Sequence, residues 1–89
     1  MNTLFVNCER TNVSNGILAI LDGKVEVIEK VGAYAHPQHE GEADGYIVVY
    51  RGTVENSEFY GAATNGDPVW KEEDESAWAD LMAEYGIKL

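Results

Sequence analysis

An Asp-Gly pair between two apolar runs constrains this chain more than any other feature. The runs cover residues 17–21 and 24–28, and Asp22 and Gly23 lie between them. A two-residue loop of this composition suits a type I′ turn, which requires a positive φ at both central residues. We therefore predict a β-hairpin over residues 17–28. The register of such a hairpin places two apolar pairs on its core face: Ile20 opposite Val25, and Leu18 opposite Val27.

Further strands are predicted on both sides of this hairpin. Residues 3–8 alternate so that Leu4, Val6 and Cys8 share one face. Residues 46–51 are apolar on both faces, which is typical of a central strand. Residues 58–63 form a shorter and weaker candidate strand. The second hairpin arm is expected to reach residue 31, with Glu29 marking an edge, a bulge or the end of the sheet.

The last predicted element is an amphipathic helix over residues 72–85. Its apolar stripe consists of Ala77, Trp78, Leu81, Met82 and Tyr85. Gly86 stands where a left-handed residue ends a helix, and Ile87 is expected to meet Met82 in a Schellman-type end. We predict a single α+β domain over residues 1–89. It is a small antiparallel sheet of four to five strands, in the order β-β-β-β-β-α, with one C-terminal α-helix packed on one face.

The charge of the chain is its most unusual bulk property. Sixteen acidic residues stand against six basic ones, for a net charge of −10. This excess disfavours direct binding to nucleic acid or to an anionic membrane, and it favours a basic partner; solubility alone is the competing explanation. A lone cysteine, the lack of an apolar run near the ~20 residues of a membrane span, and an N-terminus unlike a signal peptide indicate a cytoplasmic protein. For a phage-encoded protein this would be the host cytoplasm.

Two acidic clusters form the predicted partner-binding surface. One lies in the loop over residues 32–45, and the other begins the predicted helix. Acids in the first turn of a helix complement its dipole, which explains one or two of them, and only Lys71 offsets the rest locally. The predicted partner-binding residues are Glu40, Glu42, Asp44, Glu72, Glu73, Asp74, Glu75, Asp80 and Glu84.

Catalytic motifs are not found in the sequence. It contains no phosphate-binding glycine loop, no paired nucleophile and base, and no serine-hydrolase elbow, so we predict no enzyme activity, no catalytic residue and no cofactor. His36 and His39 give the enzyme-class alternative, a weak metal site, but we predict no tight zinc binding in a Pro/Gly loop without fixed geometry. Cys8 is interpreted as a small buried hydrophobe, because it shares a face with Leu4 and Val6. Its neighbour Glu9 would raise the pKa of the thiol, which disfavours a nucleophilic role.

These observations favour a small, acidic, non-enzymatic binding or inhibitor protein. Its expected partner is a basic protein, namely a nucleic-acid-binding protein or a nuclease complex whose groove the carboxylates occupy in place of phosphates. In size, acidity and lack of catalytic motifs the chain resembles the small anti-CRISPR and anti-restriction inhibitors of host defence nucleases that phages and mobile elements encode. The resemblance is one of composition. Two alternatives stay open: an immunity or antitoxin protein that caps a basic toxin, and a small accessory subunit.

Overall fold

The structure of the protein, a computed structural model, describes residues 3–8, 15–35, 44–54 and 68–88. Its elements follow in the order β1 (Thr3–Asn7), α1 (Asn15–Leu21), β2 (Val25–Tyr34), β3 (Gly45–Gly52) and α2 (Glu72–Glu84). The α+β class and the C-terminal helix are confirmed. Within these ranges the antiparallel sheet has three strands, not four to five. The candidate strand over residues 58–63 lies outside the described residues.

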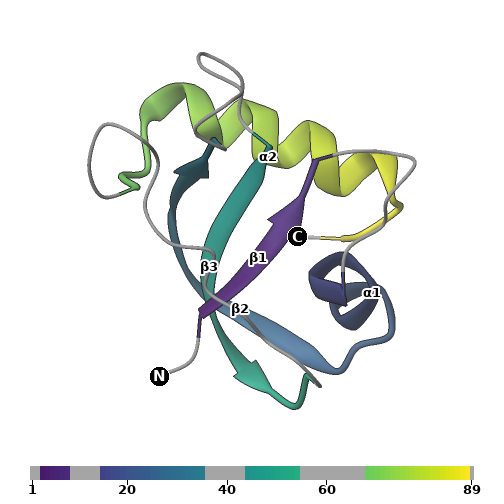
Figure 1. Cartoon of the computed structure of the whole chain (residues 1–89). Helices are drawn as coiled ribbons and strands as arrows, with labels where there is room; N and C mark the ends of the chain where they lie inside the picture. Colours follow the sequence, from purple (N-terminus) through teal and green to yellow (C-terminus); the bar gives the residue numbers. More distant parts are fainter. Residues whose placement is uncertain (1–2, 9–14, 36–43, 55–67, 89) are drawn as a thin grey trace.

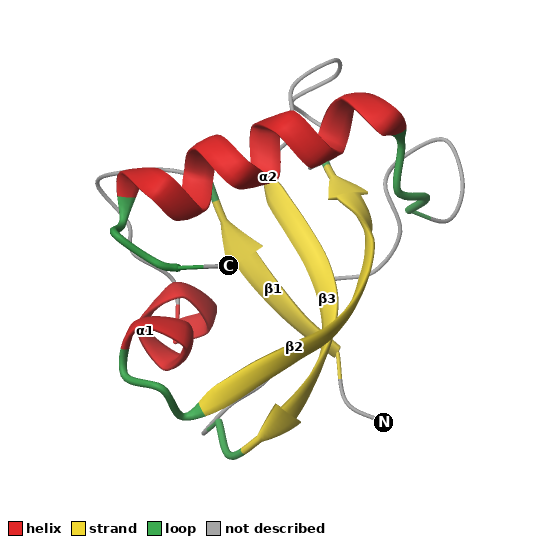
Figure 2. Ribbon diagram, turned by 180° about the vertical axis from the view of Figure 1, so that it is seen from behind, coloured by secondary structure: helices red, strands yellow, loops and turns green. Residues whose placement is uncertain are grey.

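Strand β3 is the central strand of the sheet, as its apolar residues on both faces predicted. It pairs antiparallel with β1 on one side and with β2 on the other, so β1 and β2 run in the same direction but do not pair with each other. Helix α2 lies across the end of the sheet where β1 and β2 finish and β3 begins (Figure 1). The reverse view shows the same arrangement, with α1 below α2 on the side of β1 (Figure 2).

The predicted hairpin is wrong in its first arm, because residues 17–21 all lie in helix α1. The amide of Asp22 donates to the carbonyl oxygen of Leu18 at 2.9 Å, an ordinary helical bond. Gly23 has a φ of +69° and donates to Ile20 O at 3.1 Å, and Lys24 N donates to Ala19 O at 2.9 Å. These two bonds define a Schellman motif. The Asp-Gly pair therefore ends a helix instead of closing a hairpin.

The helix changes which side chains of this segment enter the core. Ile17 is fully buried, whereas Leu18, predicted to pair with Val27 on the core face, is 45% exposed. Ile20 and Val25 do pack against the core, but from a helix and a strand and not as a cross-strand pair. Helix α1 also comes very close to β1, since a Cβ on Gly16 would lie 2.3 Å from the carbonyl oxygen of Phe5. A glycine is required at that contact.

Strand β2 is longer and more irregular than predicted. It continues to Tyr34, and its register against β3 shifts between Val27 and Glu29 and again between Lys30 and Gly32. The prediction of an edge or bulge at Glu29 is confirmed. Bulges increase the local twist and re-aim side chains, and here the register sets Lys30 opposite the buried Val48 of β3. Lys30 thus extends from an edge strand toward helix α2.

An aromatic pair covers a glycine on the sheet face opposite the helices. Gly45 begins β3 and lies opposite Tyr34 of β2. A Cβ on Gly45 would lie 2.6 Å from the ring of Phe5 and 2.3 Å from the carbonyl oxygen of Val6. The rings of Phe5 and Tyr34 meet edge to face, with their centroids 5.7 Å apart. The missing side chain at Gly45 leaves the room that the Phe5 ring occupies.

The core lies between the sheet and both helices. Trp78, Leu81 and Met82 are buried as predicted for the α2 stripe, while Ala77 is exposed. The Schellman end of α2 is confirmed, because Gly86 has a φ of +70° and the Ile87 amide donates to Met82 O at 2.9 Å. No helix in the described ranges has the length and apolar character needed to cross a bilayer. The buried cluster consists of Leu4, Val6, Ile17, Tyr46, Val48, Tyr50, Trp78, Leu81 and Met82.

Candidate partner-binding surface

The four acids that begin α2 differ in their environments, and Asp74 is the buried one. Only 8% of Asp74 is exposed, and its Oδ2 accepts a hydrogen bond from the backbone amide of Lys71 at 2.8 Å. This contact is the reach-back half of a capping box, which satisfies an amide that the helix cannot pair internally. The carboxylate of Asp74 therefore stabilises the start of the helix.

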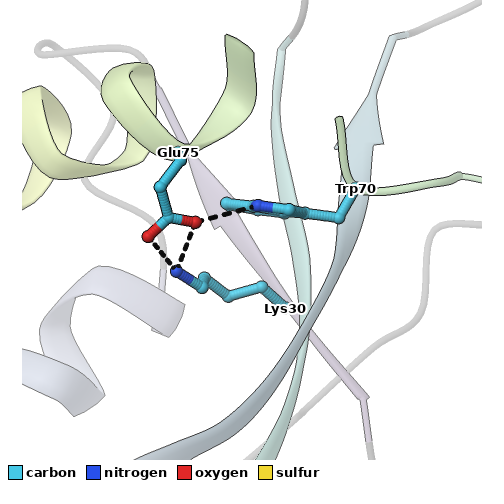
Figure 3. Close-up of polar contacts among 3 residues, drawn as sticks. All are labelled: Lys30, Trp70 and Glu75. Atoms are coloured by element: carbon cyan, nitrogen blue, oxygen red, sulfur yellow. Dashed lines mark hydrogen bonds and ion pairs between the residues drawn. The ribbon is translucent and has the colours of Figure 1, made fainter. Parts of the chain in front are cut away.

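Glu75 belongs to a contact between α2 and the edge strand β2, which we call the Lys30–Trp70–Glu75 cluster (Figure 3). Lys30 Nζ lies 2.7 Å from Glu75 Oε1 and 2.8 Å from Oε2, and Trp70 Nε1 donates to Oε2 at 3.0 Å. The ammonium also lies 4.9 Å from the centroid of the indole ring. Hydrogen bonds from Lys30 and Trp70 lower the pKa of Glu75. Lys30 therefore neutralises the charge of Glu75, for which the sequence indicated only Lys71 as a nearby basic residue.

The other acids of α2 are exposed, and the helix contains no basic residue. Glu73, Asp80 and Glu84 fall at positions i, i+7 and i+11 and so share one side of the helix. We call these three residues the outer acidic row. At 1.5 Å of rise per residue, the row extends over roughly 16 Å. Glu72 is exposed beside it.

The predicted loop over residues 32–45 is described only at its two ends, where residues 32–34 belong to β2 and Gly45 begins β3. Asp44 extends both strand ladders, because its amide donates to Tyr34 O at 2.8 Å and its carbonyl accepts from Cys8 N at 3.0 Å. Asp44 precedes β3 and therefore lies at the end of the sheet that α2 crosses (Figure 2). Glu40 and Glu42 lie outside the described residues, as do His36 and His39 of the metal alternative. Among the described residues, no three His, Cys, Asp or Glu side chains are grouped to hold a metal.

Cys8 and Tyr46 are weakly acidic groups at the same end of the sheet. Burial raises the pKa of the Cys8 thiol to about 11, and the charge of Asp44 adds to the shift. Glu9, which the sequence suggested as the source of this second effect, lies outside the described residues. Burial also raises the pKa of Tyr46 to about 12, with smaller contributions from Cys8 and Asp74. A thiol in this environment is not a nucleophile at neutral pH.

We expect the stability of the protein to fall in alkali because of these two groups. Their ordinary pKa values are 9.0 and 10.0, and the folded state raises both, so the folded chain holds these protons more tightly than the unfolded one. The stabilisation is complete below pH 9 and is lost as the pH rises toward about 12. Urea denaturation measured from pH 8 to 12 tests this, and Tyr46→Phe should flatten the upper part of the profile.

Alkylation provides an independent check on the thiol. The folded protein should react with iodoacetamide at pH 8 far more slowly than the chain unfolded in urea, because the thiolate is the reactive form. Equal rates in the two states would contradict the raised pKa of Cys8.

The Lys30–Trp70–Glu75 cluster is the part of this surface that sequence reasoning missed. Trp70 precedes the helix, and its five-residue separation from Glu75 gave only a weak hint of contact. Lys30 is 45 residues from Glu75 in the chain, and no local pattern joins them. The chain matches no protein-family model, no curated protein and no solved structure.

Proposed function

We propose that this protein is a small, non-enzymatic binding protein that engages a basic protein surface through its acidic side chains. The observation that supports it most is helix α2, which exposes Glu73 and Asp80 on one side and has no basic residue in its own sequence. The sharpest form of the proposal is a nucleic-acid mimic that occupies the groove of a nuclease or another nucleic-acid-binding protein in the cytoplasm. In size and acidity the chain resembles phage-encoded inhibitors of host defence nucleases.

Helix stability does not account for the acids in the second half of α2. Asp80 and Glu84 are four residues apart, where like charges repel. Glu84 is also the last residue of the helix, where the dipole disfavours a negative charge. Acids at these positions do not stabilise the isolated helix. The exposed Asp80 is therefore the residue of this half that most favours a role in binding.

The surroundings of the outer acidic row suit close contact with a partner. Three exposed neighbours of the row on the helix surface are small, so they do not hold a partner surface away from the carboxylates; they are Ser76, Ala77 and Ala83. A row of charges on a rigid helix also needs little ordering on binding, which lowers the entropic cost of association.

The proposal is tested by reversing charge at two places on the surface. One double variant carries Glu73→Lys and Asp80→Lys on α2. The matched control carries Glu26→Lys and Glu29→Lys on β2, where both residues are exposed, and it changes the net charge equally. A partner captured from nuclease-treated lysate should associate with the wild type at a rate that falls steeply with salt. The α2 variant should associate about tenfold more slowly, and the β2 variant much less so.

Competition separates a nucleic-acid mimic from a protein that caps one toxin. Generic duplex or single-stranded nucleic acid should displace a mimic from its partner, whereas a toxin cap protects cells only from its own toxin. An acidic or neutral partner, or an affinity that does not change with salt, would contradict the proposal. The acids of α2 would then serve solubility alone.

A further inference from the structure

We propose that Trp70 and Glu75 form the docking site for an arginine side chain of the basic partner, and that Lys30 fills this site in the free protein. This inference rests on the proposed function and names the chemistry that the partner would present. It differs from the outer acidic row because it combines an aromatic ring with a carboxylate.

The two groups are held in the arrangement that a guanidinium requires. The indole Nε1 donates to Glu75 Oε2 at 3.0 Å, which orients the carboxylate beside the ring. The ring itself is braced by Tyr46 and Trp78, whose centroids lie 5.5 Å and 6.0 Å from its own. An arginine binds an aromatic face and both oxygens of a carboxylate through one planar group.

Lys30 shows that a cation fits between these groups. Its ammonium contacts both oxygens of Glu75 and lies 4.9 Å from the indole centroid, beneath the ring in Figure 3. Lysine makes the contact as a compact point charge, without the planar fork that matches a carboxylate. A partner arginine would therefore make the better contact at the same place.

The site is open to a partner, and its occupant is exchangeable. The Glu75 side chain is 62% exposed and that of Lys30 is 30% exposed. Ion pairs this exposed contribute little to folding, so Lys30 can leave without unfolding the protein. Because Glu75 stands on α2, an arginine bound there would lie on the helix that carries the outer acidic row.

A titration with a blocked hexa-arginine peptide tests whether an arginine replaces Lys30 at this site. The readout is the NMR resonance of the Trp70 indole N–H, which is assigned by its loss in Trp70→Phe. Lys30→Met removes the internal cation but keeps the apolar stem. Lys24→Met is the matched control, because it removes the same charge from an exposed lysine that lies 3.9 Å from Asp22. Removing a competing occupant raises the fraction of open sites, so Lys30→Met should bind the peptide about threefold or more tightly than Lys24→Met. Glu75→Gln should abolish the Trp70 shift, and Glu26→Gln should retain it.

The outcomes separate this inference from the proposed function. If the amides of Glu73 and Asp80 shift while the Trp70 indole does not, the docking site is refuted and the proposed function stands. Equal affinities of Lys30→Met and Lys24→Met also refute it. A hexa-lysine peptide that moves the indole as strongly as hexa-arginine would overturn the preference for arginine. A peptide that shifts no resonance of α2 contradicts the proposed function as well.

Discussion

Replacing Ile17 with Asp is expected to unfold the protein, whereas Leu18→Asp should leave it folded. Ile17 has no exposed surface and lies in the buried cluster, so an aspartate there would bury an unpaired charge. The milder Ile17→Ala should lower the free energy of unfolding by about 2–5 kcal/mol. Leu18 is 45% exposed on the outer side of α1. Circular dichroism and urea denaturation of the three variants provide the measurement.

This pair of neighbours distinguishes a helix from the hairpin that the sequence predicts. The hairpin places Leu18 and Ile20 on the core face and Ile17 on the other. A variant series in which Leu18→Asp unfolds the chain and Ile17→Asp does not would restore the hairpin and contradict α1. Ile20 packs against the core but is half-buried, so Ile20→Asp should destabilise the fold less than Ile17→Asp.

Replacing Trp78 with Ala is expected to lower the free energy of unfolding by about 3–5 kcal/mol. Trp78 is 2% exposed and is the largest fully buried side chain of the protein's described part. Its ring meets Tyr46 edge to face, with the centroids 5.5 Å apart, and Trp70 at 6.0 Å. Small domains are stable by only about 5–15 kcal/mol, so this one truncation removes a large share of the total.

The control for this loss is Trp78→Phe, which retains an apolar ring and should recover much of the stability. Trp70→Ala should cost less than Trp78→Ala, because Trp70 is half-buried at the edge of the core. Urea denaturation of all three variants at pH 7 gives the comparison. Wild-type stability in Trp78→Ala would show that α2 is held to the sheet by other contacts.

The local sequence pattern was sufficient to predict those elements whose pattern is compatible with only one kind of structure. Strand β3 is apolar on both faces, and only a central strand buries both. The stripe around Trp78 and the glycine at position 86 together define a helix and its end, and both were predicted within a residue or two. Glu29 interrupts an apolar run, and the strand register shifts on both sides of it.

The acidic surface was predictable in composition but not in the environment of each side chain. Charge counting grouped Asp74 and Glu75 with Glu72 and Glu73. The structure pairs Asp74 with a backbone amide and Glu75 with Lys30. Both distinctions depend on which groups lie nearby in the folded chain. Four consecutive acids in the sequence do not specify those neighbours.

The sequence by itself determined that the backbone turns with a positive φ at Gly23, and it left open what precedes that turn. A type I′ hairpin and a Schellman helix end both require a residue of this kind, so Asp22-Gly23 is compatible with either. The tertiary structure selects the helix over the hairpin. Gly16 permits α1 to approach the backbone of β1, and Ile17 completes the core there, while β1 and β2 already provide both partners of β3. Long-range packing of this kind outweighs the local preference of a five-residue run, because burial of a complete apolar face contributes more free energy than intrinsic propensity does.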